Sequence, residues 1–185
     1  MLCQLIQHLR IISFKLISNA NIKGDPTLNQ PLLALGAGEI RIEGKVVIGY
    51  FPSPYFFSTY SHIEARNQSA LISIGHGTLI NNGFCAIAEH SSITIGDAVL
   101  IGTNVEIIDS DFHGIKTIDR GLSKPEWAKP VSIANSVFIG SNVKILKGVS
   151  IGAGAVIANG SFVSTDVPPN SIFGGNPARF IKAVN

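Results

Sequence analysis

The sequence predicts an all-β solenoid, a parallel β-helix with a triangular cross-section. An aliphatic residue returns at every sixth position near the C-terminus, at Ile133, Ile139, Ile145, Ile151, Ile157 and Val163. Small residues such as Gly140 and Gly152 directly follow most of these positions. A chain that turns by about 120° after each short strand stacks its coils, so these aliphatic side chains fall along one axis. We therefore expect ladders of Ile and Val inside a prism.

The composition agrees with one solenoid domain. The chain has 185 residues, of which 45% are apolar and only 14% are charged. This balance supports a buried core and argues against disorder. The net charge is +2 and no dense run of Lys or Arg occurs, which excludes a strongly cationic nucleic-acid binder. Cys3 and Cys85 form no disulfide framework and no CxxC motif, so a reducing cytoplasm is the expected compartment.

Residues 1–17 are predicted to form a helix, because their aliphatic residues roughly follow helical spacing. With the lead-in up to residue 38, this helix is expected to form a unit, 1–38, that caps the open end of the solenoid. Its longest uncharged run, from Met1 to Leu9, is far shorter than a membrane span of about 20 residues. The segment also lacks the cleavage site of a secretory signal. A peripheral membrane contact through this helix stays open as a second interpretation.

The solenoid is expected over residues 39–173, with three interruptions. The aromatic, proline-containing stretch from Phe51 to Phe57 indicates a loop outside the prism or a subunit contact. The spacing between Ile80 and Ile95 indicates a bulge of three residues. From Asp109 to Pro130 no six-residue ladder can be drawn, so we expect an excursion loop over 109–130, of the kind that usually carries function.

The last segment, 174–185, is predicted to be a short helical tail. Asn176 is a plausible N-cap and Pro177 would take the first helical position. Arg179 and Lys182 are three residues apart, so on a helix they would share a face.

Several motifs, some within the repeat and some beyond it, resemble those of one enzyme family. They are Ile95-Gly96-Asp97, Asp109-Ser110-Asp111-Phe112-His113, Val137-Phe138-Ile139-Gly140-Ser141, Lys147-Gly148-Val149, Asp166-Val167-Pro168-Pro169-Asn170 and Gly175-Asn176-Pro177-Ala178-Arg179. With the repeats, they resemble the hexapeptide-repeat acyltransferases over about 63–182, in the branch of galactoside, maltose and capsular-polysaccharide O-acetyltransferases. The resemblance implies a left-handed β-helix and a homotrimer with active sites between subunits. It also implies acetyl-CoA as the acyl donor, a carbohydrate acceptor and no metal.

The chemistry of such a transfer indicates His113 as the general base. A sugar hydroxyl has a very high pKa, so a base must take its proton during attack on the thioester, and a histidine suits that task. His113 stands where the ladder gives way to the excursion loop and matches the family's base. Asp109 and Asp111 are both candidates to orient its ring or to hold an acceptor hydroxyl, and both are equally compatible with turn formation.

By resemblance, Asn82 and Phe138 would bind the acceptor together with Asp111. Most relatives carry tryptophan where this chain has Phe138, which keeps the aromatic face and loses the indole N–H. Trp127, the only tryptophan, lies in the excursion loop and either enters the same cavity or packs the loop down.

Coenzyme A is expected in the groove between neighbouring prisms. By resemblance, its pantetheine arm would be lined by Ser141, Asn159, Ser164 and Thr165. Arg179 and Lys182 would bind the nucleotide phosphates, because cationic side chains attract phosphate groups. The alternative is that these residues belong to a solvated tail and bind nothing.

Three rival interpretations have weaker support. A zinc site like that of γ-carbonic anhydrases needs three convergent histidines, but His62, His76 and His90 are fourteen residues apart and do not stack in register. A non-enzymatic scaffold needs a regular exposed face, which the loop around His113 interrupts. An N-acetyltransferase acting on a nucleotide-linked amino sugar remains the alternative. Such relatives usually begin with an extra α/β domain, which we do not expect before these coils.

Overall fold

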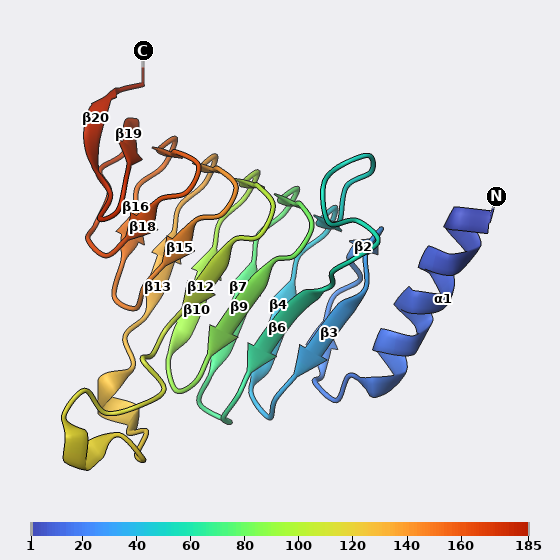
Figure 1. Cartoon of the computed structure of the whole chain (residues 1–185), viewed down its shortest axis with the longest axis horizontal. Helices are drawn as coiled ribbons and strands as arrows, with labels where there is room; N and C mark the ends of the chain where they lie inside the picture. Colours follow the sequence, from blue (N-terminus) through green and yellow to red (C-terminus); the bar gives the residue numbers. More distant parts are fainter. Residues whose placement is uncertain (1, 185) are drawn as a thin grey trace.

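The computed structural model describes residues 2–184, and of Leu2 and Cys3 it describes the backbone only. The prediction about the thiol of Cys3 therefore lies outside the described part. One helix, α1 (Leu2–Ile17), precedes a solenoid of short strands that runs from one end of the molecule to the other (Figure 1). Two 3₁₀ helices, η1 (Thr117–Asp119) and η2 (Pro125–Trp127), lie in the loop that leaves the solenoid, as predicted for 109–130.

The strands form three sheets, and successive coils of the chain add strands to each sheet in turn. The first sheet contains β1 (Ile22–Lys23), β4 (Glu39–Ile42), β7 (Leu71–Ile74), β10 (Ser92–Ile95), β13 (Val131–Ile133) and β16 (Ser150–Ile151). The second contains β2 (Thr27–Leu28), β5 (Val47–Ile48), β8 (Leu79–Ile80), β11 (Leu100–Ile101), β14 (Phe138–Ile139), β17 (Val156–Ile157), β19 (Ser171–Gly174) and β20 (Arg179–Ala183). The third contains β3 (Leu32–Leu35), β6 (Ser61–Ala65), β9 (Cys85–Ala88), β12 (Glu106–Ile108), β15 (Lys144–Ile145) and β18 (Phe162–Val163).

The internal ladders confirm the six-residue repeat. Aliphatic residues of successive coils pair directly in each sheet: Ile95, Ile133 and Ile151 in the first, Ile101, Ile139 and Ile157 in the second, and Ile107, Ile145 and Val163 in the third. All of these side chains are buried in one core. Each coil therefore adds three aliphatic side chains to a shared interior, which stabilises the stack by burial of apolar surface.

The corner between β9 and β10 contains the predicted three-residue bulge, at Glu89, His90 and Ser91. The backbone N–H groups of these residues donate to the carboxylate of Asp109, at 2.7, 3.2 and 2.7 Å. Buried N–H groups without a strand partner need such an acceptor. Asp109 is itself fully buried and begins the excursion loop, so it fastens that loop to the preceding coil.

Helix α1 confirms the predicted N-terminal helix and packs beside β3 at the N-terminal end (Figure 1). The side that faces the solenoid includes Gln7, Arg10 and Phe14, whose ring lies 4.8 Å from that of Tyr60. Gln7 is only 5% exposed, and its side-chain nitrogen donates to the carbonyl oxygen of Asn29 at 3.0 Å. Arg10 donates to the carbonyl oxygen of Thr59 at 2.7 Å. A row of aliphatic residues on the helix is exposed: Leu5, Leu9, Ile12 and Leu16. Within residues 2–184, no helix has the length and apolar character needed to cross a membrane.

The prediction of a C-terminal helix is wrong. β20 (Arg179–Ala183) runs antiparallel to β19 (Ser171–Gly174), so the tail is a hairpin. Gly175 has a φ of 100°, which favours glycine in this turn, and the Asn176–Pro177 peptide bond is cis. The rings of Phe173 and Phe180 lie 6.0 Å apart across the two strands. A Gly-Gly-Asn-Pro segment is compatible with a turn as well as with the start of a helix. In the structure it forms a turn, and the two strands on either side of it pack their aromatic rings together.

Candidate active site

His113 lies in the excursion loop after β12, with an exposed side chain. Its Nδ1 atom lies 2.9 Å from the carbonyl oxygen of Arg120 in the same loop. A carbonyl oxygen only accepts hydrogen bonds, so Nδ1 carries the proton and donates it. In the neutral ring Nε2 then keeps its lone pair. The loop thereby holds an imidazole with a defined tautomer and an available basic nitrogen.

A cavity of about 370 Å³ opens beside His113, and Trp127 at the end of η2 also lines it. The structure thus brings these two predicted site residues together. The ammonium group of Lys124 lies 5.1 Å from the centroid of the Trp127 ring. Lys124 also lines the cavity, together with Asp111, Ile115, Lys116, Asp119 and Lys147. An aromatic face with charged groups of both signs suits a polar ligand.

Among the described residues, neither of the two candidate aspartates forms a hydrogen bond or ion pair with the ring of His113. Asp111 accepts a hydrogen bond from Lys147 Nζ at 2.7 Å, and Lys147 also donates to the carbonyl oxygen of Trp127 at 2.8 Å. The carboxylate of Asp109 is occupied by the corner that follows β9. The carbonyl group of Arg120 orients the ring instead, and no sequence pattern singles it out. Asp111 lines the cavity, so its contact with an acceptor stays a prediction.

Asn82 is fully buried and anchors the aromatic loop that leaves the prism between β5 and β6. Its Oδ1 atom accepts a hydrogen bond from the backbone N–H of Tyr50 at 3.1 Å. Its Nδ2 atom lies 3.0, 3.3 and 2.9 Å from the carbonyl oxygens of Tyr50, Ser53 and Pro54. The structure does not support the predicted contact of Asn82 with an acceptor, because both polar atoms of its side chain are used inside the protein.

Phe138 lies in β14 on the outer face of the second sheet, with 47% of its surface exposed. It pairs with Leu100 on one side and Val156 on the other, and Leu100 pairs with Leu79. These residues form an outward apolar ladder beside a cavity of about 290 Å³ that Phe138, Leu100 and Leu79 help to line. His113 follows a strand of the third sheet, so one chain does not place it in the same cavity as Phe138.

Ser141 and Asn159 occupy matching corners of successive coils. The backbone N–H of Ser141 donates to Asn159 Oδ1 at 2.8 Å. A Cβ atom at Gly140 would lie 2.3 Å from the same oxygen, which explains the glycine at this corner. Ser164 and Thr165 follow β18 and are exposed. None of these four predicted coenzyme residues lines the His113 cavity, so their role stays a prediction.

Arg179 and Lys182 are exposed on β20. The expectation that they share a helical face is wrong, since the segment is a strand. Arg179 donates to the carbonyl oxygen of Ala178 at 2.9 Å, next to the turn of the hairpin. Their contact with coenzyme phosphates stays a prediction, which their exposure permits.

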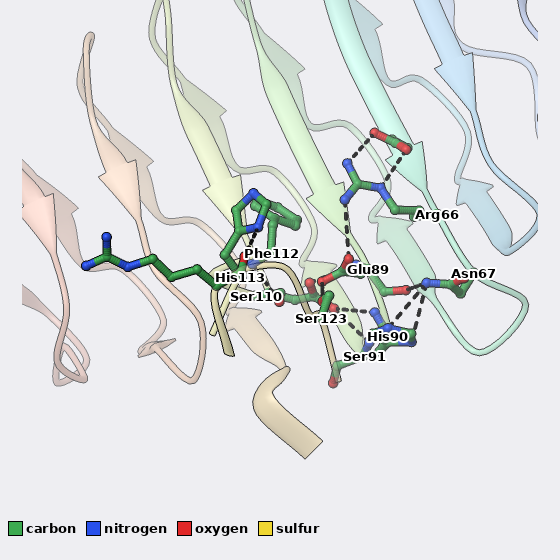
Figure 2. Close-up of polar contacts among 12 residues, drawn as sticks. Arg66, Asn67, Glu89, His90, Ser91, Ser110, Phe112, His113 and Ser123 are labelled. Carbon is green, nitrogen blue, oxygen red and sulfur yellow. Dashed lines mark hydrogen bonds and ion pairs between the residues drawn. The ribbon is translucent and has the colours of Figure 1, made fainter. Parts of the chain in front are cut away.

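Sequence reasoning missed an ion cluster around the buried carboxylate of Glu89 at the base of the loop. Glu89 is 5% exposed; its carboxylate accepts from Ser123 Oγ at 2.7 Å and lies 3.4 Å from Arg66 Nη1 (Figure 2). Burial acts to raise the pKa of Glu89, but hydrogen bonds from Ser123 and Ser110 and the charge of Arg66 lower it overall. The guanidinium carbon of Arg66 also lies 4.8 Å from the ring centroid of Phe112. These residues come from the same corner of three successive coils, which is the signal that could have found them.

The three histidines considered for zinc lie on different parts of the coil. His62 is in β6, His76 lies between β7 and β8, and His90 lies between β9 and β10. Among the residues that the structure describes, no three His, Cys, Asp or Glu side chains form a metal-binding group.

Comparison with known proteins relates this geometry to one family. The family profile "Bacterial transferase hexapeptide (six repeats)" matches residues 130–165. The galactoside O-acetyltransferase of Escherichia coli K12 is 34% identical over 168 residues, which cover 81% of this chain and 82% of that protein. Two further relatives are putative acetyltransferases of Schizosaccharomyces pombe and Saccharomyces cerevisiae. The chain spans about half of their length, 47% of the first and 56% of the second.

Solved structures show the same fold. The polySia-specific acetyltransferase NeuO superposes with a TM-score of 0.73 and 31% identity, covering 88% of this chain and 70% of that one. The hexapeptide-repeat acetyltransferase VCA0836 of Vibrio cholerae, complexed with acetyl-CoA, gives a TM-score of 0.59 and 33% identity, over 78% and 71% of the two chains. The chain therefore belongs to the hexapeptide-repeat acetyltransferase family and has its left-handed parallel β-helix fold.

Proposed function

We propose that the protein transfers an acetyl group from acetyl-CoA to a hydroxyl group of a carbohydrate, with His113 as the general base. The observation that carries this proposal is the 2.9 Å hydrogen bond between His113 Nδ1 and the carbonyl oxygen of Arg120. It fixes the ring through Nδ1 and leaves Nε2 without a hydrogen bond among the described residues, on a side chain that lines an open cavity. The similarity to a structure complexed with acetyl-CoA supports the donor, and the similarity to O-acetyltransferases supports a sugar hydroxyl.

In the proposed reaction, His113 Nε2 takes the proton of the acceptor hydroxyl as its oxygen bonds to the carbonyl carbon of the thioester. The tetrahedral intermediate then collapses, the C–S bond breaks, and the proton passes from Nε2 to the leaving thiolate. The products are an acetyl ester and free coenzyme A, without an acyl-enzyme. Cys85 does not suit a nucleophilic role, because burial raises the pKa of its thiol to about 11.

We infer that the working unit is a homotrimer in which neighbouring chains complete each site. The outward ladder of the second sheet supports this, because Leu79, Leu100 and Phe138 expose 46%, 46% and 47% of their surfaces. Exposed apolar residues in a continuous row are typical of subunit interfaces. The matching outward row of the first sheet is polar, at Arg41, Ser73, Thr94, Ser132 and Ser150. In such a trimer, Phe138 of one chain would lie near His113 of the next.

The exposed row on α1 supports the proposed peripheral membrane contact. Leu5, Leu9, Ile12 and Leu16 point away from the solenoid, and α1 contains no Asp or Glu that anionic lipids would repel. Cosedimentation with phosphatidylglycerol vesicles tests this contact. Binding by the wild type that a Leu9→Gln/Leu16→Gln variant loses is expected, and wild-type protein that stays in the supernatant contradicts the contact.

The transferase proposal is tested by incubating purified protein with acetyl-CoA and a panel of sugars and capsule oligosaccharides. Free coenzyme A is measured by thiol reagent against a protein-only blank, since the chain has two cysteines of its own. Mass spectrometry of the acceptor must show an added acetyl group. Thiol release that depends on the acceptor and is lost in His113→Ala is expected. Full transfer by His113→Ala contradicts the proposed base.

A further inference from the structure

Glu89 is a buried carboxylate at the base of the excursion loop, in the corner after β9. Glutamate is rarely buried unless partners match its charge. Its Oε2 atom accepts from Ser123 Oγ at 2.7 Å, and its Oε1 atom lies 3.4 Å from Arg66 Nη1. One partner, Ser123, belongs to the excursion loop, and another, Arg66, belongs to the corner after β6. The charge of Glu89 therefore interacts with the base of the loop and not with the apolar core of the solenoid.

The partners of Glu89 lie against both arms of the loop: the outgoing arm, which contains Phe112 and His113, and the returning arm, which contains Arg120 and Ser123. On the outgoing arm, Arg66 places its guanidinium carbon 4.8 Å from the ring centroid of Phe112, the residue before His113. On the returning arm, Ser123 donates its hydroxyl to Glu89. Figure 2 shows Arg66, Glu89 and Ser123 joined by these contacts next to Phe112 and His113. One carboxylate therefore connects the two arms.

The outgoing arm holds an unusual backbone conformation. Phe112 has a φ of 60°, a left-handed conformation that a bulky side chain rarely adopts unless surrounding contacts hold it. Its N–H donates to Ser110 Oγ at 3.1 Å, and its ring rests against Arg66. The backbone conformation of Phe112 therefore determines the direction in which the side chain of His113 points.

The returning arm supplies the hydrogen-bond acceptor of His113. The carbonyl oxygen of Arg120 accepts from His113 Nδ1 at 2.9 Å, and that of Leu122 accepts from the N–H of Gly114 at 3.0 Å. Ser123 directly follows Leu122. Its hydrogen bond to Glu89 therefore fixes the end of the segment that carries both carbonyl groups.

We propose that Glu89 is a positioning residue, which ties both arms of the loop to the solenoid and so holds His113 as the Nδ1–H tautomer. This inference rests on the proposed role of His113 and adds the group that aims it. Glu89 forms no hydrogen bond or ion pair with the imidazole among the described residues and acts on it through Arg66, Phe112 and Ser123. Loss of its charge weakens the hold on Ser123 and removes one contact of Arg66, which keeps its hydrogen bonds to Glu64 at 2.9 and 3.2 Å. The returning arm then loses its anchor, and the His113 ring loses its fixed carbonyl partner and populates both tautomers.

The test is Glu89→Gln in the full-length protein, which keeps the shape of the side chain and removes its charge. Glu126→Gln, an exposed position in the same loop, is the matched control. Histidine side chains are labelled with ¹⁵N, and the His113 signal is assigned by its absence in His113→Ala. We expect Nδ1–H in the wild type and the control, and a tautomer mixture in Glu89→Gln. We also expect kcat to fall about 10- to 100-fold in Glu89→Gln, with the KM for acetyl-CoA within about twofold.

The NMR readout does not depend on turnover, so it separates this inference from the proposed reaction. An unchanged tautomer together with unchanged kcat in Glu89→Gln overturns the positioning role. If Glu89→Gln does not fold, Ser123→Ala carries the same test, since it removes one hydrogen bond from an exposed serine. Full activity of His113→Ala, with a tautomer shift in Glu89→Gln, would instead refute the base and leave the positioning contact standing.

Discussion

The ammonium group of Lys147 lies 2.7 Å from the carboxylate of Asp111, and both residues line the cavity beside His113. Lys147 also donates to the carbonyl oxygen of Trp127 at 2.8 Å. A single side chain on the solenoid therefore holds a residue near each end of the excursion loop. The wall of the cavity depends on this bridge.

Replacing Lys147 by methionine is expected to weaken acceptor binding more than stability. The ion pair is partly solvated, so its loss should cost at most about 1 kcal/mol of folding free energy. The released Asp111 and Trp127 should raise the KM for the acceptor about three- to tenfold, measured by thiol release at varied acceptor concentration. Lys144→Met is the control, because Lys144 pairs with Glu106 and does not line the cavity. Equal kinetic effects of the two variants would contradict a role for the Lys147 bridge.

Cys85→Ala is expected to keep wild-type activity to within about twofold. The thiol of Cys85 has a pKa raised to about 11, mainly by burial, so almost no thiolate exists at neutral pH. Direct transfer needs no nucleophile from the protein. Intact-protein mass spectrometry after mixing with acetyl-CoA should show no acetylated Cys85. An acetyl-cysteine that forms and decays at the rate of turnover would overturn direct transfer.

The solenoid could be predicted from sequence because its repeat is local. Each aliphatic residue lies six positions from the next, and stacking brings residues such as Ile133 and Ile151 together without any information from elsewhere in the chain. The C-terminal hairpin could not be predicted in this way. Its segment has acceptable helix signals, and the pairing of Phe173 with Phe180 across the turn becomes visible only in three dimensions.

The candidate site was only partly predictable for the same reason. His113 and Trp127 fall in the one long break of the repeat, which the sequence shows directly. The role of Asn82 depends on where the aromatic loop folds back, and the cluster of Glu89 and Arg66 depends on which corners stack. Contacts of this kind join residues that lie more than twenty positions apart, so they follow from the stacking of corners and not from a local pattern.

Stability is expected to fall as the pH drops below the ordinary range of carboxyl pKa values. The pKa of Glu64 is lowered, chiefly by its hydrogen bond from Arg66, and the pKa of Glu89 is lowered as well. A carboxyl whose folded pKa lies below its unfolded pKa stabilises the fold above the unfolded value of about 4.3, and this contribution disappears as pH falls through the folded pKa. Urea denaturation between pH 3 and pH 7 measures this slope. Glu89→Gln should show a shallower acid slope, and an unchanged slope would contradict an ionised Glu89.

Asn82→Ala is expected to destabilise the protein by about 2–4 kcal/mol, because the carbonyl groups of the aromatic loop lose a buried donor. The side chain is fully buried and contacts Tyr50, Ser53 and Pro54. The loss is measured by urea denaturation. Turnover per folded molecule should change less than stability, since Asn82 presents no free polar atom to an acceptor. A large rise in the acceptor KM with unchanged stability would restore the direct acceptor contact.

Mixed trimers test whether neighbouring chains share a site. In one chain, His113 and Phe138 line different cavities, so a shared site must take them from two chains. We expect His113→Ala and Phe138→Ala to be nearly inactive alone. Co-expression with two different tags and sequential purification isolates trimers that contain both variants. In a cyclic trimer each such particle has one interface that joins an intact His113 to an intact Phe138, so activity should return to about one third of the wild-type value. If both residues acted within one chain, no mixed trimer would contain an intact pair, and activity would stay at the level of the separate variants.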